Sequence, residues 1–156
     1  MNTITILDPT GSVSVLFSRV PAEKVNYLAA FRVDGDGSGP SHGDPCYQPT
    51  TALLRAGKSL NSDIDLYGVV PPQIVSATEG IMLGCLGKCT NQTNHKQAII
   101  VCGDKGPHNK CGEGSIALAR ALGIPSSPTT GGIDQHVILW EWWPGVAAPG
   151  YQLQKS

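Results

Sequence analysis

The stretch IIVCGDKGPHNKCGEGSIALARAL (Ile99–Leu122) decides the fold that we expect for this chain. It begins as an apolar strand that ends at Cys102 and continues through a glycine-rich loop with one proline. A helix is predicted from Glu113 to Leu122, because apolar side chains recur four residues apart and Gly123 and Pro125 end the pattern. The stretch therefore joins a strand, a tight loop and the one helix that the sequence predicts.

Strand-like patterns dominate the rest of the chain. We expect strands at residues 12–18, 26–33, 66–70, 80–85, 97–102 and 136–143, with a hairpin between residues 85 and 97. The 19 glycines and 12 prolines favour short strands and many turns over long helices. The sequence thus predicts an α+β fold that is mainly β: a compact, barrel-like sheet of about six strands with one short helix carrying Glu113.

The bulk composition limits the classes of protein to consider. With 156 residues the chain fits one domain, and 40% apolar with 15% charged residues is typical of a folded chain. We expect an N-terminal arm or first strand at 1–25, a domain with the candidate chemistry at 26–145, and a C-terminal tail at 146–156. A net charge of −1 argues against nucleic acid as a partner, and no apolar stretch predicts a membrane span.

Two carboxylates flank the loop of the deciding stretch. Asp104 follows the predicted strand and Glu113 opens the predicted helix, so the two side chains can face one another across a cleft. A glycosidase needs such a pair, one to protonate the leaving oxygen and one to activate water or attack the sugar. Ordinary turn chemistry for Asp104 and compensation of the helix dipole by Glu113 are the simpler interpretations. Because that dipole favours the charged form of Glu113, a general acid here needs burial or a nearby negative charge.

An acidic, glycine-rich segment, DGDGSGPSHGD, covers residues 34–44. Asp34, Asp36 and Ser38 match the first ligand positions of a calcium loop, but Pro45 stands where that loop requires a bidentate Glu. We therefore predict no metal. Asp34 and Asp36 are interpreted either as side chains that bind a cationic sugar or as parts of a solvated turn.

The cysteines and tryptophans have structural interpretations as well as functional ones. The spacing of the five cysteines follows no paired zinc pattern and leaves a single disulfide open, either Cys85–Cys89 or Cys102–Cys111. The tryptophans at positions 140 and 142 lie on the same face of the last predicted strand. We expect core packing for them ahead of stacking on sugar rings.

Four blocks of the sequence resemble glycoside hydrolase family 75, a family of chitosanases. The blocks are VDGDG (33–37), QPTTALLRAGKSLN with YGVVPP (48–61 and 67–72), VCGDKGPHNKCGEGSIALARALGI (101–124) and PTTGGIDQHVILW (128–140). They occur in the order of the family and span residues 28 to 141. The first 25 residues lie outside the resemblance.

The resemblance implies an endo-acting chitosanase that cleaves β-1,4 bonds between glucosamine units with inversion. It implies Asp104 as the base that activates water and Glu113 as the general acid. The substrate-binding residues that it implies are Asp34, Asp36, Gln48, Thr50 and Thr130. It implies no cofactor. The expected partner is a polysaccharide, chitosan or a related amino-sugar polymer, and we expect a monomer.

Two alternatives stay open. Lys105 and Lys110 flank the loop and would repel a polycation or bind a carboxylated substrate, which favours a peptidoglycan-cleaving enzyme of lysis or wall remodelling. A non-catalytic sugar-binding module on the same fold is the second. The N-terminal sequence lacks the charged and apolar regions of a signal peptide, yet we expect the protein to act outside the cell by an export route that is left open.

Overall fold

The computed structural model describes residues 2–107 and 110–154. Within these residues the chain forms ten strands and two helices. The strands are β1 (Asn2–Asp8), β2 (Gly11–Phe17), β3 (Val25–Asp34), β4 (Leu54–Arg55), β5 (Lys58–Ser59), β6 (Tyr67–Val70), β7 (Cys85–Asn91), β8 (Gln97–Lys105), β9 (Glu113–Ser115) and β10 (Ile133–Ala147). The helices are α1 (Pro72–Thr78) and α2 (Ile116–Ala121). Neither helix is long and apolar enough to cross a membrane.

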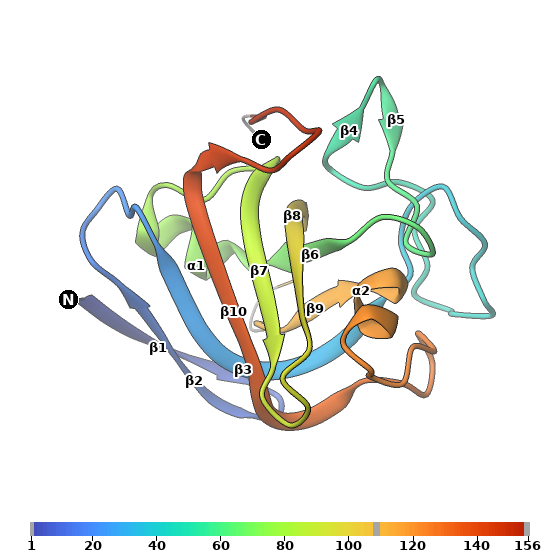
Figure 1. Ribbon diagram of the computed structural model, residues 1–156, viewed down its shortest axis with the longest axis horizontal. Coiled ribbons are helices and arrows are strands. Elements are labelled where there is room, and N and C mark those ends of the chain that lie inside the picture. Colours follow the sequence, from blue (N-terminus) through green and yellow to red (C-terminus); the bar gives the residue numbers. More distant parts are fainter. Residues whose placement is uncertain (1, 108–109, 155–156) are drawn as a thin grey trace.

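Six strands close into a barrel. Eight strands form one sheet in the order β1-β2-β3-β10-β7-β8-β6-β9, and β9 also pairs with β3, so the sheet closes on itself from β3 to β9 (Figure 1). The β6–β8 and β3–β9 pairs are parallel, whereas the other pairs around the barrel are antiparallel. The mainly β fold with a barrel of about six strands and a short helix is therefore confirmed.

Tryptophans from β10 fill the barrel interior. Trp140 and Trp142 are fully buried, because alternate residues of a barrel strand face inward. The ring of Trp140 stacks on Phe31 with 5.5 Å between centroids, and Trp142 Nε1 donates a hydrogen bond of 3.0 Å to the Tyr27 hydroxyl. The prediction of core packing for both tryptophans is confirmed, so neither ring is available for a sugar.

A hairpin at the N-terminus extends the barrel sheet. β1 and β2 pair over their whole length, from Asn2 with Phe17 to Asp8 with Gly11, and the end of β2 pairs with the start of β3. The apolar side chains on its inner face, Ile6, Val13, Val15 and Phe17, are buried. Because each such side chain contributes about 1.5–3 kcal/mol when it leaves water, the hairpin is held firmly against the barrel.

The helix of the deciding stretch begins later than expected. Ser115 caps α2, and its Oγ accepts a 3.2 Å hydrogen bond from Leu118 N, which fixes the helix start at Ile116. Glu113 lies on β9, where it pairs with β3 and β6. The prediction that the helix carries Glu113 is wrong, because the backbone at Glu113 takes part in sheet pairing.

Two further expectations about local structure are wrong. The sequence predicts one helix, but a second, α1, begins at Pro72 directly after β6, a position that suits proline because its missing N–H needs no partner there. The strand predicted at 80–85 instead begins at Cys85 as β7. Its inward positions are cysteine, glycine and asparagine, so it lacks the apolar alternation that marks a strand.

The five cysteines are all free thiols, and four of them are buried. The Cys102 side chain on β8 makes a hydrogen bond to Cys85 on the neighbouring strand β7, and this contact together with burial raises the pKa of the Cys102 thiol. Neither of the two disulfides left open by the spacing forms, since Cys102 faces Cys85 instead of Cys111.

Candidate active site

An acidic cleft of about 290 Å³ opens where β3 ends and β9 begins. Charged side chains line it from several elements: the carboxylates Asp34, Asp36, Asp44, Glu113 and Asp134, and the cations Arg32 and Lys110. Carboxylates thus outnumber cations in this cleft. Such an excess attracts cationic ligands and raises the pKa of each carboxyl group through its neighbours.

Backbone pairing fixes Glu113 at the cleft. β9 lies between β3 and β6, with Glu113 opposite Arg32 on one side and Val69 on the other. Gly112 makes this close approach possible, since a Cβ there would lie 1.9 Å from the Ala30 carbonyl oxygen. Arg32 N donates a 2.7 Å hydrogen bond to the Gly112 carbonyl. The glycine before Glu113 is therefore required by packing.

Glu113 keeps its proton close to neutral pH. Burial raises the pKa of its carboxyl group to about 7, Lys110 and Arg32 lower it, and the negative charges of Asp36 and Asp104 raise it further. A helix dipole would favour the charged form of Glu113, but its effect is weakened because Glu113 lies on a strand before the helix cap. Its environment therefore suits a general acid.

Asp104 lies on β8 and is held by backbone donors. Its Oδ1 accepts hydrogen bonds from Ala52 N at 3.2 Å and Lys105 N at 2.9 Å. Burial raises its pKa, the two N–H donors lower it, and the charge of Asp36 raises it. At the preceding Gly103 a Cβ would lie 2.7 Å from the Tyr67 Cβ, so glycine allows the strand to pack there. Packing of the strands thus explains both glycines, Gly103 before Asp104 and Gly112 before Glu113.

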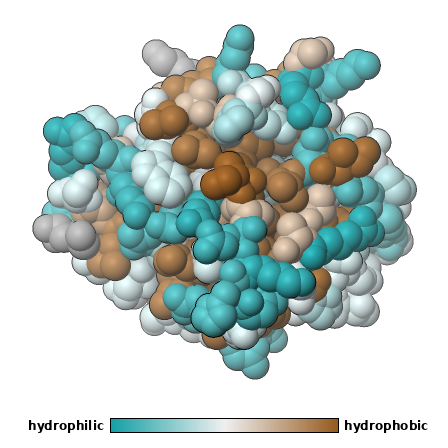
Figure 2. Space-filling model, viewed as in Figure 1, coloured by the Kyte–Doolittle hydropathy of each residue, from teal (hydrophilic) through white to brown (hydrophobic). Residues whose placement is uncertain are grey.

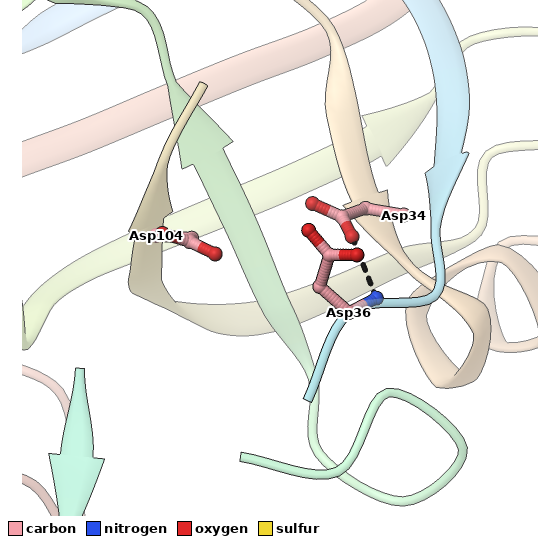
Figure 3. Close-up of side chains that lie close together, drawn as sticks. All are labelled: Asp34, Asp36 and Asp104. Carbon is pink, nitrogen blue, oxygen red and sulfur yellow. Dashed lines mark hydrogen bonds between the residues drawn. The ribbon is translucent and has the colours of Figure 1, made fainter. Parts of the chain in front are cut away.

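The carboxylate of Asp104 lies close to two carboxylates of the cleft, those of Asp34 and Asp36. An oxygen from each of the three lies within 4.8 Å of the others, and Figure 3 shows the side chains turned toward a common space. Asp34 Oδ1 also accepts a 2.8 Å hydrogen bond from Asp36 N. Burial and the neighbouring charges raise the pKa of Asp34 to about 7, and burial raises that of Asp36. These oxygens could hold a cation, but acidic groups are common without one, and we assign none.

The other predicted substrate-binding residues are placed differently. Gln48 reaches the cluster through its backbone, because its N–H donates a 2.7 Å hydrogen bond to Asp36 Oδ1. Thr50 is exposed and is not among the residues that line the cleft. Thr130 is also exposed, next to the cleft residue Gly131, and its N–H donates to Ser127 Oγ. The structure thus brings together Asp34, Asp36 and Asp104, whereas the two threonines lie outside the lining.

Sequence reasoning missed several charged residues around the cleft. Arg32 and Asp134 line it directly, and Asp8 reaches its wall from the N-terminal hairpin through Arg32. The position of Arg32, two residues before Asp34 on the same strand, was a usable signal. No local pattern marks Asp8, because it depends on a tertiary contact across 24 residues.

Other hollows of the surface have a different character. One of about 560 Å³ is lined by Arg55 and Tyr151, and another of about 390 Å³ by apolar residues such as Ile99 and Leu66. Figure 2 shows apolar surface in the middle of one face, surrounded by hydrophilic surface. Neither hollow has two carboxylates to act as acid and base, so the acidic cleft is the better candidate for catalysis.

Comparison with protein-family models finds no match, and comparison with curated proteins finds none either. The interpretation of function therefore depends on two features of the chain itself. These features are the four sequence blocks quoted above and the geometry of the acidic cleft.

Proposed function

We propose that the protein is an inverting endo-glycosidase that cleaves β-1,4 bonds in chitosan. The observation that carries the proposal is Glu113, a carboxyl group in an acidic cleft whose pKa is about 7 because of burial. The second support is Asp104, whose carboxylate meets those of Asp34 and Asp36 beside the cleft. The resemblance to glycoside hydrolase family 75 assigns the same two residues as the catalytic pair.

In this mechanism one carboxyl group donates a proton and the other accepts one. Glu113 donates its proton to the glycosidic oxygen as the C1–O bond breaks, and is left as a carboxylate. Asp104 takes a proton from a water molecule, whose oxygen attacks C1 from the opposite face of the ring. Hydrogen bonds from the N–H groups of Ala52 and Lys105 stabilise Asp104 as the charged base. Inversion requires a separation of about 6.5–9.5 Å between the two carboxyl groups.

The charge of the cleft favours a polymer with protonated amines. Arg32 is already paired with Asp8 at 3.0 Å, so much of its charge is compensated from behind. Asp34, Asp36 and Asp134 then face a cationic sugar, and Lys110 is the cation among the described lining residues that opposes them. An ammonium group of glucosamine placed among these carboxylates would lower their pKa values and gain charge-assisted hydrogen bonds.

Lys110 supports a second candidate, a glycosidase that acts on peptidoglycan. Its ammonium group lies in the cleft wall near Glu113 and lowers the pKa of that carboxyl group. A lysine at this place suits a sugar that carries a carboxylate, as peptidoglycan does. The acid and base would be the same two residues, and only the polymer would differ.

The test measures products from chitosan, chitin and peptidoglycan by mass spectrometry, and the anomer first released by NMR. We expect oligomers from chitosan with inverted configuration. Glu113→Gln and Asp104→Asn should each lower the rate by at least about 10²-fold, the usual contribution of a positioned acid or base. Glu23→Gln is the control, because Glu23 is an exposed partner of Arg19 on the surface.

Each other outcome selects an alternative. Release of fragments from peptidoglycan alone would transfer the proposal to that polymer. Binding of chitooligosaccharides without product over long incubation would indicate the non-catalytic module. A Glu113→Gln variant that hydrolyses chitosan at the rate of the parent protein would contradict the mechanism.

A further inference from the structure

An ion pair between a buried carboxylate and a partly exposed arginine links the N-terminal hairpin to the wall of the acidic cleft. Asp8, at the end of β1, has a side chain only 1% exposed and accepts hydrogen bonds from Arg32 Nη1 at 3.1 Å and Nη2 at 3.0 Å. Its Oδ1 also accepts a 3.0 Å hydrogen bond from Cys111 N, in the loop just before Glu113. Asp8 therefore holds both Arg32, which is opposite Glu113 in the β3–β9 pair, and the backbone that leads into Glu113.

The hairpin turn completes this network. The Thr10 N–H and hydroxyl both donate to Asp8 Oδ2, at 2.9 and 2.5 Å, and the Thr10 hydroxyl lies 2.8 Å from His136 Nε2 on β10. Burial alone would raise the pKa of Asp8, but the hydrogen bonds from Arg32, Thr10 and Cys111 hold it well below its usual range. The carboxylate is therefore charged throughout the neutral range, and its charge balances that of Arg32.

We propose that Asp8 is a positioning residue for Glu113, which acts by holding the Arg32 guanidinium and the Cys111 N–H in one hydrogen-bonded network. The inference rests on the proposed role of Glu113 as general acid. It also assigns the N-terminal hairpin, which lies outside the family resemblance, a part in the chemistry of the cleft.

The charges around Glu113 determine the direction of the effect. Among the described residues, the charged groups around it are Arg32 and Asp34 from β3, Asp36 and Asp44 from the following loop, Asp104 from β8, Lys110 from the loop before β9, and Asp134 from β10. Of the two cations, Arg32 is the one with a buried counter-charge behind it. Without the Asp8 carboxylate to hold it, the guanidinium is free to turn toward Glu113, and Glu113 would lose its proton at a lower pH.

The experiment titrates Glu113 directly, by carbon NMR of its side-chain carboxyl group in the full chain. Asp8→Asn should lower the pKa of Glu113 by roughly 1 unit, because the released Arg32 guanidinium can then approach it. Arg32→Gln should raise that pKa, and in the Arg32→Gln background Asp8→Asn should change it no further. Glu23→Gln, which removes the carboxylate of an exposed arginine pair, should leave it unchanged. A purely structural role for Asp8 predicts no such opposite pair of shifts.

Every outcome decides the inference. A folded Asp8→Asn variant with an unchanged titration of Glu113 overturns it. If Asp8→Asn does not fold, Arg32→Gln and the double variant decide: an unchanged pKa in Arg32→Gln, or a further shift in the double variant, overturns it. The titration needs no substrate, so hydrolysis is measured separately. Shifts as expected in a protein that cleaves no polymer would defeat the proposed function and leave the network's effect on Glu113 standing.

Discussion

At the scale of single residues, burial and neighbouring charges set the behaviour of the cleft. Glu113 has a pKa of about 7 in the folded protein, against an ordinary value of 4.5, because burial disfavours its charged form. Below pH 4.5 the group is protonated in both folded and unfolded chains and has no effect on stability. As pH rises toward 7, the unfolded chain releases the proton while the folded chain retains it, so the folded state loses stability.

This linkage predicts that Glu113→Gln stabilises the protein at alkaline pH. Glutamine has no charge to bury, so the gain in free energy of unfolding should be larger at pH 8 than at pH 4, by up to about 3 kcal/mol at 1.4 kcal/mol per pKa unit. Urea unfolding at the two pH values measures it. Glu23→Gln, on the exposed surface, should show no such dependence. An equal effect of Glu113→Gln at both pH values would mean that Glu113 titrates normally.

Some residues of the site can be recognised from the sequence, and others cannot. Asp104 and Glu113 could be selected because a strand, a loop and a helix follow one another in a single stretch, and their roles came from the family resemblance. Asp34 and Asp36 stood out as acidic residues, but their contact with Asp104 depends on how β3 and β8 meet in the barrel. Asp8 gave no signal, since its contacts to Arg32 and Cys111 exist only after the hairpin folds back.

At the scale of elements, sheet pairing overrides local preference. The alternating apolar patterns of β3, β8 and β10 are visible in the sequence, and the structure has strands at those places. β9 could not be predicted, because three residues of Glu-Gly-Ser have no apolar pattern and become a strand only between β3 and β6. Because of the same pairing, Glu113 lies on the sheet and not on the helix in which the sequence predicts it.

Close approach of β9 to β3 leads to a prediction about Gly112. A methyl group there would lie 1.9 Å from the Ala30 carbonyl oxygen, which belongs to the backbone and cannot rotate away. Gly112→Ala should therefore cost at least about 2 kcal/mol of stability, in the range for overpacked sites. Gly145→Ala is the matched control, since a Cβ at Gly145 meets no atom within 4 Å. Urea unfolding of both variants measures the difference, and equal stability would show that β9 can move away from β3.

At the scale of the whole molecule, the indole ring of Trp142 packs against separate parts of the barrel wall. A Cβ at Gly68 on β6 would lie 2.8 Å from Trp142, and one at Gly87 on β7 would lie 2.5 Å from it. The two glycines leave room for the ring, and its Nε1 donates to Tyr27 on β3. Because β6 and β7 are not neighbours in the sheet, Trp142 fills the space between different sides of the barrel.

Trp142→Leu should therefore destabilise the barrel far more than Trp143→Leu. At position 142 the change leaves a cavity and removes the partner of a buried hydroxyl, so we expect a loss of at least about 3 kcal/mol. Trp143 points outward, is partly exposed and contacts Lys24 through a cation–π interaction with 5.3 Å to the ring centroid. Its replacement should cost about 1 kcal/mol. Thermal and urea unfolding compare the stability of the two variants. Trp142 and Trp143 are neighbours on one strand and differ in the face of the sheet on which they lie. Similar losses of stability would therefore contradict the view that the buried ring of Trp142 stabilises the barrel.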